Sequence, residues 1–425
     1  MKVLIVGAGG REHALAWAIA RSPRAPEILA APGNAGLQEI GRLAPIPADD
    51  IDALAALAAS EKVDLTIVGP EAPLVVGIVD LFRSRGLRIF GPQRRAAVLE
   101  GSKVFAKELM RRHGIPTAPF EIFSSERKAA AFLESATTTY PKVIKADGLA
   151  AGKGVVIAGT AGEAIETIRR MMLDRKLGSA GEQIVVEDFL DGEEVSVFAL
   201  CRGTSYFLLP TAQDHKRLLD GDAGPNTGGM GAYSPYPRWT ADLENRVRAE
   251  IIEPTLRAME TEGRPYHGLL YFGLMIREGR PFVLEYNCRF GDPETQAIMP
   301  LIEGDILDAL DAASSGDPGT LPPLAVRAGS AAVVVLASRG YPESYEKGFP
   351  IRGCEAAGGL PRTIVFHAAT RRGVSAPLTD GGRVLGVVGT GADLKEALRG
   401  AYEGVSMIEF EGKIYRKDIG RRGLA

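Results

Sequence analysis

The sequence has few cysteines and no pattern among them. Cys201, Cys288 and Cys354 are odd in number, lie far apart, and form no Cys-x-x-Cys pair. This usage excludes a disulfide framework and a cysteine zinc site, and it is typical of a reducing compartment. The five histidines show no metal-ligand spacing either. We therefore expect a cytoplasmic protein without a histidine or cysteine metal cluster.

Long apolar runs and an excess of one charge are also missing. No stretch of about 18 apolar residues is present, so no membrane span is predicted. The apolar run at residues 3–6 is too short for a signal peptide. Lys plus Arg is 50 and Asp plus Glu is 53, a formal charge of −3. This balance disfavours nucleic acid and anionic membranes as partners. We expect a monomer that acts on small molecules.

The remaining composition predicts a globular protein of several domains. Of the 425 residues, 45% are hydrophobic and 24% are charged, and the length favours two to four domains. In residues 1–101, short apolar runs alternate with helical periodicities, which predicts an open parallel α/β domain. Residues 102–325 form a second unit, with a small lobe at about 120–190 and longer antiparallel strands after residue 193. Residues 326–425 predict a small α+β domain that ends in a strand at residues 406–412. The fold class is thus α/β and α+β, multidomain.

A glycine-rich turn follows the first expected strand. Gly7, Gly9 and Gly10 place backbone N–H groups at a helix N-terminus, which suits an anionic ligand. The dinucleotide fingerprint fails, because Glu12 takes the third glycine position and no acidic residue ends the second strand. A nicotinamide site is therefore disfavoured, and a plain tight turn remains the alternative. The loops at residues 32–36 and 69–73 should meet this turn at the carboxyl edge of the sheet, where open α/β folds bind ligands.

Residues 145–155 form a second glycine-rich loop. It is no Walker loop, because Asp147 and Gly154 stand where that motif needs glycine and Ser or Thr. Since the loop joins two expected strands, it predicts a flap over a nucleotide, with Lys153 reaching a phosphate. A solvated hairpin tip is the alternative. Lys145 lies late in an apolar strand, where a lysine needs an anionic partner or a route to water.

The segment EYNCRFGDPET carries the strongest local signal. Glu285 and Asn287 are two positions apart on an expected strand, so both side chains face the same way. A carboxylate and an amide oxygen on one face suit Mg²⁺, which proteins hold together with substrate phosphates. Arg289 follows and could stabilise a transferring phosphoryl group. The alternative is a surface ion-pair cluster.

Two further segments are less specific. In VVEDFLDGEE, backbone groups could bind an adenine edge and Glu194 the ribose hydroxyls, although a solvated turn explains the segment as well. Residues 213–235 are expected to form a long irregular stretch, and such loops are usually functional or disordered. Asp214, Lys216 and Arg217 bring both charges to it, while the lone His215 between them is more often incidental than catalytic.

Taken together, these motifs resemble the phosphoribosylamine–glycine ligase family of the ATP-grasp superfamily. The resemblance runs in order from residue 2 to about 422 and rests on these strings: GGREHALAW, APGNAG, DLTIVGPEAPL, IFGP, LEGSK, KADGLAAGKGV, FLDGEE, QDHKR, GPNTGGMGAYSP, EYNCRFGDPETQ and RKDIG. It implies that residues 102–325 form an ATP-grasp unit. It also implies that ATP, glycine and 5-phosphoribosylamine give ADP, phosphate and glycinamide ribonucleotide through a glycyl phosphate, in purine biosynthesis, with Mg²⁺ or Mn²⁺.

The resemblance also implies roles for single residues. Around ATP it places Lys103, Lys145, Lys153, Gly154, Glu187, Leu190 and Glu194. At the metal it places Glu285 and Asn287. Its candidates for catalysis are Lys145, Asp214, Lys216 and Arg289. Its candidates for contact with glycine or phosphoribosylamine are Gly10, Asn34, Pro70, Glu71, Asp214, Arg289 and Thr295.

Two departures from the family pattern and three alternative functions remain. Ala8 stands where many members carry Asn, and the strand LLYFGLMI lacks the second metal carboxylate that many superfamily relatives have. The alternatives are an ATP-grasp ligase for another purine intermediate, a nicotinamide oxidoreductase, and a nucleotide-binding module without activity. ADP formation that depends on phosphoribosylamine would distinguish the predicted ligase from all three.

Overall fold

The computed structural model describes residues 1–149, 154–174, 181–315 and 319–424. Its first sheet is parallel, in the order β3-β2-β1-β4-β5. The strands are β1 (Lys2–Gly7), β2 (Glu27–Pro32), β3 (Arg42–Leu43), β4 (Leu65–Val68) and β5 (Ile89–Phe90). The helices are α1 (Gly10–Ile19), α2 (Leu37–Ile40), α3 (Ile51–Ser60), α4 (Glu71–Val76), α5 (Ile78–Ser84) and α6 (Arg94–Gly101). Since the chain continues in opposite directions from β1, the crevice between the ends of β1 and β4 is the switch point where such folds bind ligands.

Local capping signals explain several helix boundaries. The Asp50 carboxylate accepts a hydrogen bond from the Ala53 N–H at 3.0 Å, so α3 begins there. Ser102 caps α7 (Lys103–His113) in the same way, and Gly114 ends it at φ 66°. The segment LVVGIVDLFRSRG has the apolar content of a single helix, but Gly77 at φ 102° divides it into α4 and α5.

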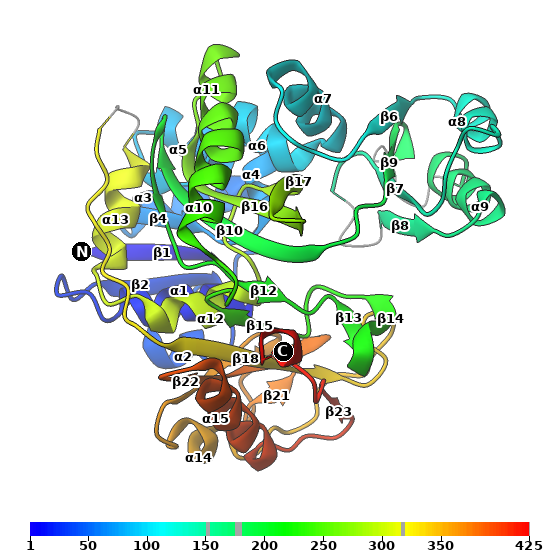
Figure 1. Ribbon diagram of the computed structural model, residues 1–425. Coiled ribbons are helices and arrows are strands. Elements are labelled where there is room, and N and C mark those ends of the chain that lie inside the picture. Colours follow the sequence, from blue (N-terminus) through cyan, green and yellow to red (C-terminus); the bar gives the residue numbers. More distant parts are fainter. Residues whose placement is uncertain (150–153, 175–180, 316–318, 425) are drawn as a thin grey trace.

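The central unit consists of two lobes. The small lobe is a sheet in the order β6-β9-β7-β8 with two helices: β6 (Phe120–Phe123), β7 (Lys142–Ala146), β8 (Val155–Ala158), β9 (Ile184–Asp188), α8 (Glu126–Leu133) and α9 (Ala161–Met172). It projects away from the rest of the molecule in Figure 1 and buries an apolar cluster of its own that includes Leu133, Ile144 and Ile168. The apolar core of the first domain, in contrast, continues into the large lobe.

The large lobe is an antiparallel sheet in the order β11-β10-β16-β17. Its strands are β10 (Glu193–Arg202), β11 (Ser205–Leu208), β16 (His267–Arg277) and β17 (Arg280–Asn287). Between β11 and β16 the chain forms α10 (Ala241–Val247) and α11 (Glu253–Thr261), joined by a π-helical turn (Arg248–Ile252). After β17 come α12 (Glu294–Ile298), a 3₁₀ turn (Met299–Leu301) and α13 (Ile306–Ser314). Figure 1 shows the end of β17 turned toward the small lobe.

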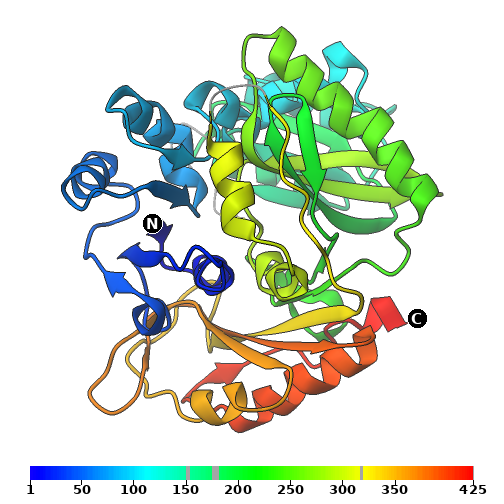
Figure 2. The same cartoon turned by 90° about the vertical axis from the view of Figure 1, so that its left-hand side faces the viewer.

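The C-terminal sheet crosses the boundary expected at residue 326. Its order is β12-β15-β18-β22-β19, with β23 on β18, and β12 (Gln213–Asp214) and β15 (Gly231–Ser234) come from the middle of the chain. The other strands of the sheet are β18 (Ser330–Ser338), β19 (Thr363–His367), β22 (Arg383–Gly391) and β23 (Lys413–Ile414). The helices of this domain are α14 (Cys354–Gly358) and α15 (Leu394–Met407). Figure 2 shows this sheet alongside the first domain and the large lobe. The irregular stretch expected at 213–235 is thus largely paired.

Short elements complete the chain: the hairpin β13 (Arg217–Leu219) and β14 (Ala223–Asn226), the pair β20 (Thr370–Arg371) and β21 (Leu378–Thr379), and α16 (Arg421–Leu424). The prediction of a strand at residues 406–412 is wrong. Buried Ala397, Ala401 and Val405 keep helical spacing to the end of α15, and only Glu409 forms an isolated bridge. Among the described residues, no helix is long and apolar enough to cross a membrane.

Two buried histidines join the first and last domains. The His367 N–H donates to His13 Nδ1 at 2.8 Å, and His367 Nδ1 lies 3.0 Å from Thr370 Oγ1. Burial lowers the pKa of His13 to about 3 and that of His367 to about 4. Both histidines are therefore still neutral in the folded protein near pH 6.5, where a histidine of the unfolded chain gains a proton.

We expect this pair to make the protein sensitive to mild acid. Above pH 6.5 the two histidines are unprotonated in both the folded and the unfolded protein. Between pH 6.5 and 4 only the unfolded protein gains protons on them, so the free energy of unfolding decreases as the pH is lowered. When the pH is lowered from 6.5 to 5, each histidine should reduce the free energy of unfolding by roughly 2 kcal/mol. Urea unfolding at pH 6.5 and pH 5 should show a smaller decrease in the free energy of unfolding for His13→Gln than for the wild type. The control is the exposed His113→Gln, and an equal loss in all three proteins would contradict the prediction.

Candidate active site

Glu285 and Asn287 flank a residue that packs into the core. Between them Tyr286, 3% exposed, packs edge-on against Phe272 at a centroid distance of 5.5 Å. Strand alternation therefore turns the carboxylate and the amide to the opposite face. Opposite Glu285 on β16 stands Gly273, where a Cβ would lie only 3.1 Å from the Glu285 Cγ. No second carboxylate comes from that position, as the sequence indicated.

Cations surround Glu285. Lys216 Nζ lies 3.6 Å from Glu285 Oε1, and Lys145 Nζ donates to the neighbouring Leu284 carbonyl at 2.9 Å. Burial would raise the pKa of Glu285, but the charges of Lys216, Lys145, Lys103 and Arg289 lower it to about 2. Glu285 is therefore ionised at neutral pH, within a cluster of positive charge that suits a polyphosphate.

Lys145 has the anionic partner that its strand position required. Its Nζ lies 3.0 Å from Glu187 Oε1, and Lys107 Nζ lies 2.9 Å from Glu187 Oε2. Glu187 is 2% exposed, its carboxylate is committed to the two lysines, and its backbone lies in β9 between β6 and β7. Leu190, 7% exposed, lies just beyond. The sequence analysis missed Lys107, although its place among the buried residues of α7, beside Ala106, was a usable signal.

Lys103 and the base of the glycine-rich loop are tied together. Lys103 Nζ donates to the Gly148 carbonyl at 2.8 Å, while Asp147 accepts from Ser102 Oγ and from the Val104 N–H, both at 3.0 Å. The loop is thus anchored to the start of α7. Gly154 lies where the chain enters β8, and its carbonyl accepts from the Ala146 N–H at 2.8 Å. Lys153 lies outside the described residues.

Lys216 and Glu194, assigned to catalysis and to ribose, contact each other directly. Since Lys216 also approaches Glu285, the structure places it beside the predicted metal ligand. Asp214 accepts from the His215 N–H at 2.6 Å. Burial raises the pKa of Asp214 well above its usual value; Glu294 and Glu194 add to the rise, and Lys216 opposes it.

His215 has a structural role. Its Nε2 accepts the Gly420 N–H at 3.2 Å, and its Nδ1 lies 3.3 Å from the Gly231 carbonyl. Burial and the charges of Arg416 and Arg422 lower its pKa to about 4. The neutral ring therefore connects the QDHKR segment to the RKDIG segment. Arg416, 1% exposed, strengthens this connection, because its Nη1 donates to the Arg217 carbonyl at 3.0 Å.

Arg289 joins the end of β17 to the first domain. Its Nε donates to Glu71 Oε2 at 3.2 Å, and its Nη2 lies 3.1 Å from Glu100 Oε1. Glu71 stands on the first turn of α4, with Pro70 as the preceding cap residue. Burial would raise the pKa of Glu71, but Arg289 and Arg11 lower it. Glu100 was missed, because nothing in a helical LEG string indicates that its carboxylate meets an arginine far along the chain.

Glu12 fills the crevice beside the first glycine-rich turn. Its carboxylate accepts from the Gly9 N–H at 2.5 Å and from Arg11 Nε at 2.6 Å. A Cβ at Gly69 would lie 1.9 Å from Glu12 Oε1, so the carboxylate takes up the space between the two loops. An acidic group there disfavours a pyrophosphate, which agrees with the expectation against a nicotinamide cofactor.

Three of the residues assigned to substrate binding contact other residues of the protein. Asn34 Nδ2 donates to the carbonyls of Ala8 and His367 at 2.8 and 2.9 Å. Thr295 Oγ1 donates to the Gly291 carbonyl at 2.6 Å and is fully buried. Gly10 packs against Gln296, since a Cβ at Gly10 would lie 2.5 Å from its Nε2. Their contact with a substrate stays a prediction, and the backbone of these loops is the part available for it.

Gly229 provides a test of this arrangement. It has φ 107°, and a Cβ there would lie 2.4 Å from Pro293 Cδ and 2.7 Å from Asp214 Oδ1. We expect Gly229→Ala to displace Asp214 and to lower kcat/KM for glycine at least about tenfold, because positioning errors of an ångström are costly. Gly221→Ala is the control, since it has φ 68° and no atom within 4 Å. Equal kinetics in the two variants would contradict the prediction.

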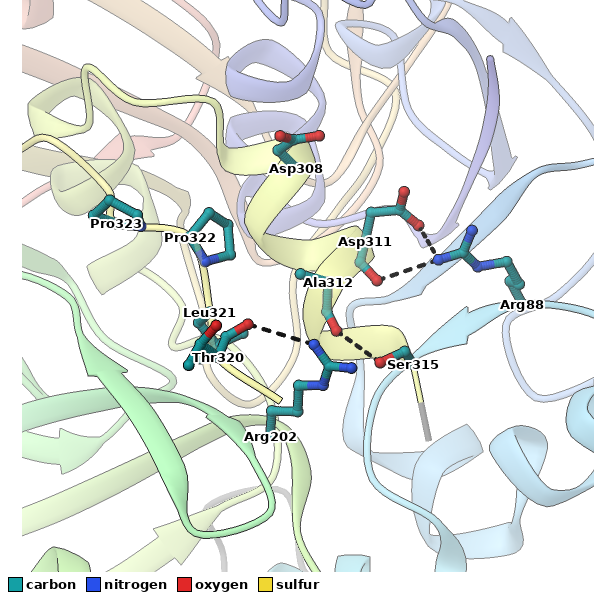
Figure 3. Close-up of a pocket in the computed structure, with 10 residues that line it drawn as sticks. All are labelled: Arg88, Arg202, Asp308, Asp311, Ala312, Ser315, Thr320, Leu321, Pro322 and Pro323. Carbon is teal, nitrogen blue, oxygen red and sulfur yellow. Dashed lines mark hydrogen bonds and ion pairs between the residues drawn. The ribbon is translucent and has the colours of Figure 1, made fainter. Parts of the chain in front are cut away.

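A hollow of about 590 Å³ lies elsewhere on the molecule (Figure 3). It contains none of the predicted site residues, and its lining charges have partners. Arg88 Nη2 lies 2.7 Å from Asp311 Oδ1, and Arg202 Nη1 donates to the Thr320 carbonyl at 3.4 Å. The hollow is therefore separate from the cation cluster around Glu285.

Comparison with known proteins identifies the family. The models of the phosphoribosylglycinamide synthetase N domain, ATP-grasp (A) domain and C domain match residues 1–100, 101–295 and 331–422. The chain is 51% identical over 427 residues to a phosphoribosylamine–glycine ligase of Chlorobaculum tepidum, and 52% identical over 429 residues to one of Ralstonia nicotianae. Each alignment covers 100% of both chains.

Solved structures agree. The crystal structure of phosphoribosylamine–glycine ligase from Thermotoga maritima has a TM-score of 0.85 at 37% identity and covers 99% of this chain and 100% of that one. A biotin carboxylase domain from Hydrogenobacter thermophilus has a TM-score of 0.74 at 15% identity over 97% of this chain and 91% of that one, and shares the fold alone. The predicted fold class and resemblance are confirmed. The chain belongs to the phosphoribosylglycinamide synthetase family, the phosphoribosylamine–glycine ligases built on an ATP-grasp domain.

Proposed function

We propose that this chain joins glycine to 5-phosphoribosylamine in purine biosynthesis, converting ATP to ADP and phosphate. The relatives that match along their whole length carry this activity in their names. The observation that supports it most directly is the ionised Glu285 among Lys103, Lys145, Lys216 and Arg289. Such a cluster can neutralise a triphosphate beside a small carboxylate substrate, and phosphoryl transfer needs positioning and charge neutralisation more than covalent help.

The proposed chemistry has two steps. A glycine carboxylate oxygen attacks the γ-phosphorus, the bond from that phosphorus to the ADP oxygen breaks, and glycyl phosphate forms. The amine of phosphoribosylamine then attacks the glycyl carbonyl carbon, loses a proton and displaces phosphate. Lys103 and Lys145 are the proposed contacts of the ATP phosphates. Arg289 at the end of β17 would stabilise the charge that develops between the two substrates.

Glu285 and Asn287 are the proposed ligands of a divalent cation beside β17. Among the described residues, no three His, Cys, Asp or Glu side chains gather as a metal cluster. The Glu285 carboxylate and the Asn287 amide each offer an oxygen donor. Mg²⁺ is commonly held by one or two such protein groups, with substrate phosphates completing its coordination. The ion, Mg²⁺ or Mn²⁺, would neutralise phosphate charge, and Glu285 and Asn287 would hold it.

Measuring ADP tests the function. The protein with ATP and glycine should form ADP rapidly only after phosphoribosylamine is added, and glycinamide ribonucleotide should appear in equal amount. ADP formation that ignores phosphoribosylamine would contradict the substrate assignment. ATP binding without ADP formation would favour the nucleotide-binding module.

We infer further that the protein acts as a cytoplasmic monomer. The scattered cysteines, which are typical of a reducing compartment, support the cytoplasmic location. Light scattering should give a mass near 45.2 kDa in solution. A mass twice as large would contradict it.

A further inference from the structure

Arg383 brings a charge from the C-terminal domain to the middle of the candidate site. It is the first residue of β22, and its side chain is 21% exposed. Its Nη1 donates to the Gly228 carbonyl at 2.5 Å and to the Asp292 carbonyl at 2.8 Å, and its Nη2 lies 3.3 Å from Asp292 Oδ2. One guanidinium thus holds two loops of the central unit that are far apart in sequence.

The two loops lead to different parts of the site. On one side, Gly229 follows the Gly228 contact and packs against Asp214, one of the residues assigned to glycine. On the other side, Asp292 reaches the first domain, because a Cβ at Gly9 would lie 3.2 Å from Asp292 Oδ2. Arg383 therefore stands between the predicted glycine loop and the turn predicted for phosphoribosylamine.

Neighbouring contacts support a rigid junction. The Gly228 N–H donates to the hydroxyl of Tyr341, a second side chain of the C-terminal domain, at 2.9 Å. Gln296 Nε2 donates to Asp292 Oδ1 at 2.8 Å, so the aspartate is held from both sides. Burial would raise the pKa of Asp292, but Arg383 and Arg11 lower it, which keeps the carboxylate ionised and paired.

We propose that Arg383 is a positioning residue that sets the phosphoribosylamine site relative to the glycine site. The proposal rests on the proposed function. Its contacts are to protein carbonyls and to Asp292, so it acts through the two loops. A planar guanidinium with several fixed donors can hold two loops in one geometry, which a lysine ammonium cannot reproduce.

The test compares Arg383→Met, Arg383→Lys and the wild type. We expect Arg383→Met to raise KM for phosphoribosylamine at least about tenfold, because the loops that meet that substrate lose their shared anchor. The Kd for ATP, measured by equilibrium dialysis, should change less than twofold, because Arg383 contacts none of the residues placed around ATP. Arg383→Lys should lie between, since it keeps the charge opposite Asp292.

Arg362→Met is the matched control, because Arg362 also lies in the C-terminal domain but pairs with Glu396 at 3.1 Å on the exposed side. Three outcomes would overturn the proposal: equal changes in KM for phosphoribosylamine and Kd for ATP, no change in either, or a lower kcat at constant KM. A wild-type protein without phosphoribosylamine-dependent ADP formation would refute the proposed function instead.

Discussion

Glu285→Gln is expected to lower kcat by about a thousandfold or more, because metal-bound charge stabilisation of a phosphoryl group is worth several kcal/mol. The glutamine keeps the shape and one oxygen of the side chain but loses the charge. Four cations lower the pKa of Glu285 to about 2, so the wild-type carboxylate carries its charge throughout the neutral range. The loss of rate should therefore be similar at every pH from about 5 to 9.

The fold should survive this substitution. Lys216 keeps Glu194, Lys145 keeps Glu187, and Arg289 keeps Glu71 and Glu100. Lys216, Lys145 and Arg289 thus each retain an anionic partner, and the free energy of unfolding should change little. Low activity with unchanged urea unfolding is the expected combination.

Single-turnover rates at saturating Mg²⁺ measure the effect. Glu278→Gln is the matched control, since it makes the same chemical change at the exposed turn of the same hairpin. If Glu285→Gln kept the wild-type rate at saturating Mg²⁺, Glu285 would not belong to the reaction site. If the rate fell only at low Mg²⁺, its role would be limited to metal affinity.

The parts of the fold that follow from local chemistry were predictable. Asp50 and Ser102 are residue types that favour the N-cap and stand directly before the helices they cap, and period-two alternation placed Glu285 and Asn287 on one face around Tyr286. Each of these inferences needs only neighbours within a few residues. The alternation around Tyr286 is also the inference on which the metal prediction depends.

The parts that depend on distant pairing were not predictable. β15 joins the C-terminal sheet because Gly231 pairs with Val334, and no local signal in a glycine-rich stretch indicates that partner. The same limit applies to side chains. Lys145 clearly needed an anion, but the choice of Glu187, shared with Lys107, follows from β7 lying beside β9. Arg383 is the extreme case, because all its partners belong to another domain.

Arg289→Met is the second substitution with a large expected effect, and it should act on both stability and rate. Arg289 forms an ion pair with Glu100, whose side chain is 6% exposed. Leaving a buried charge without its partner costs about 3–5 kcal/mol. Loss of the guanidinium should also lower kcat by about a hundredfold or more, as removal of one donor to a developing charge does. Urea unfolding and steady-state kinetics measure the two effects separately.

The double variant Arg289→Met/Glu100→Gln separates a structural role of Arg289 from a chemical one. Burial already raises the pKa of Glu100 and Arg289 opposes this, so the single variant should regain stability as pH falls and Glu100 gains a proton. Glutamine removes the buried charge and still offers an oxygen to the Cys288 N–H, which Glu100 accepts at 2.6 Å. Stability should therefore recover in the double variant while kcat stays low. If kcat recovered as well, Arg289 would only hold β17 against the first domain, and charge stabilisation would have to come from Lys103, Lys145 and the metal ion.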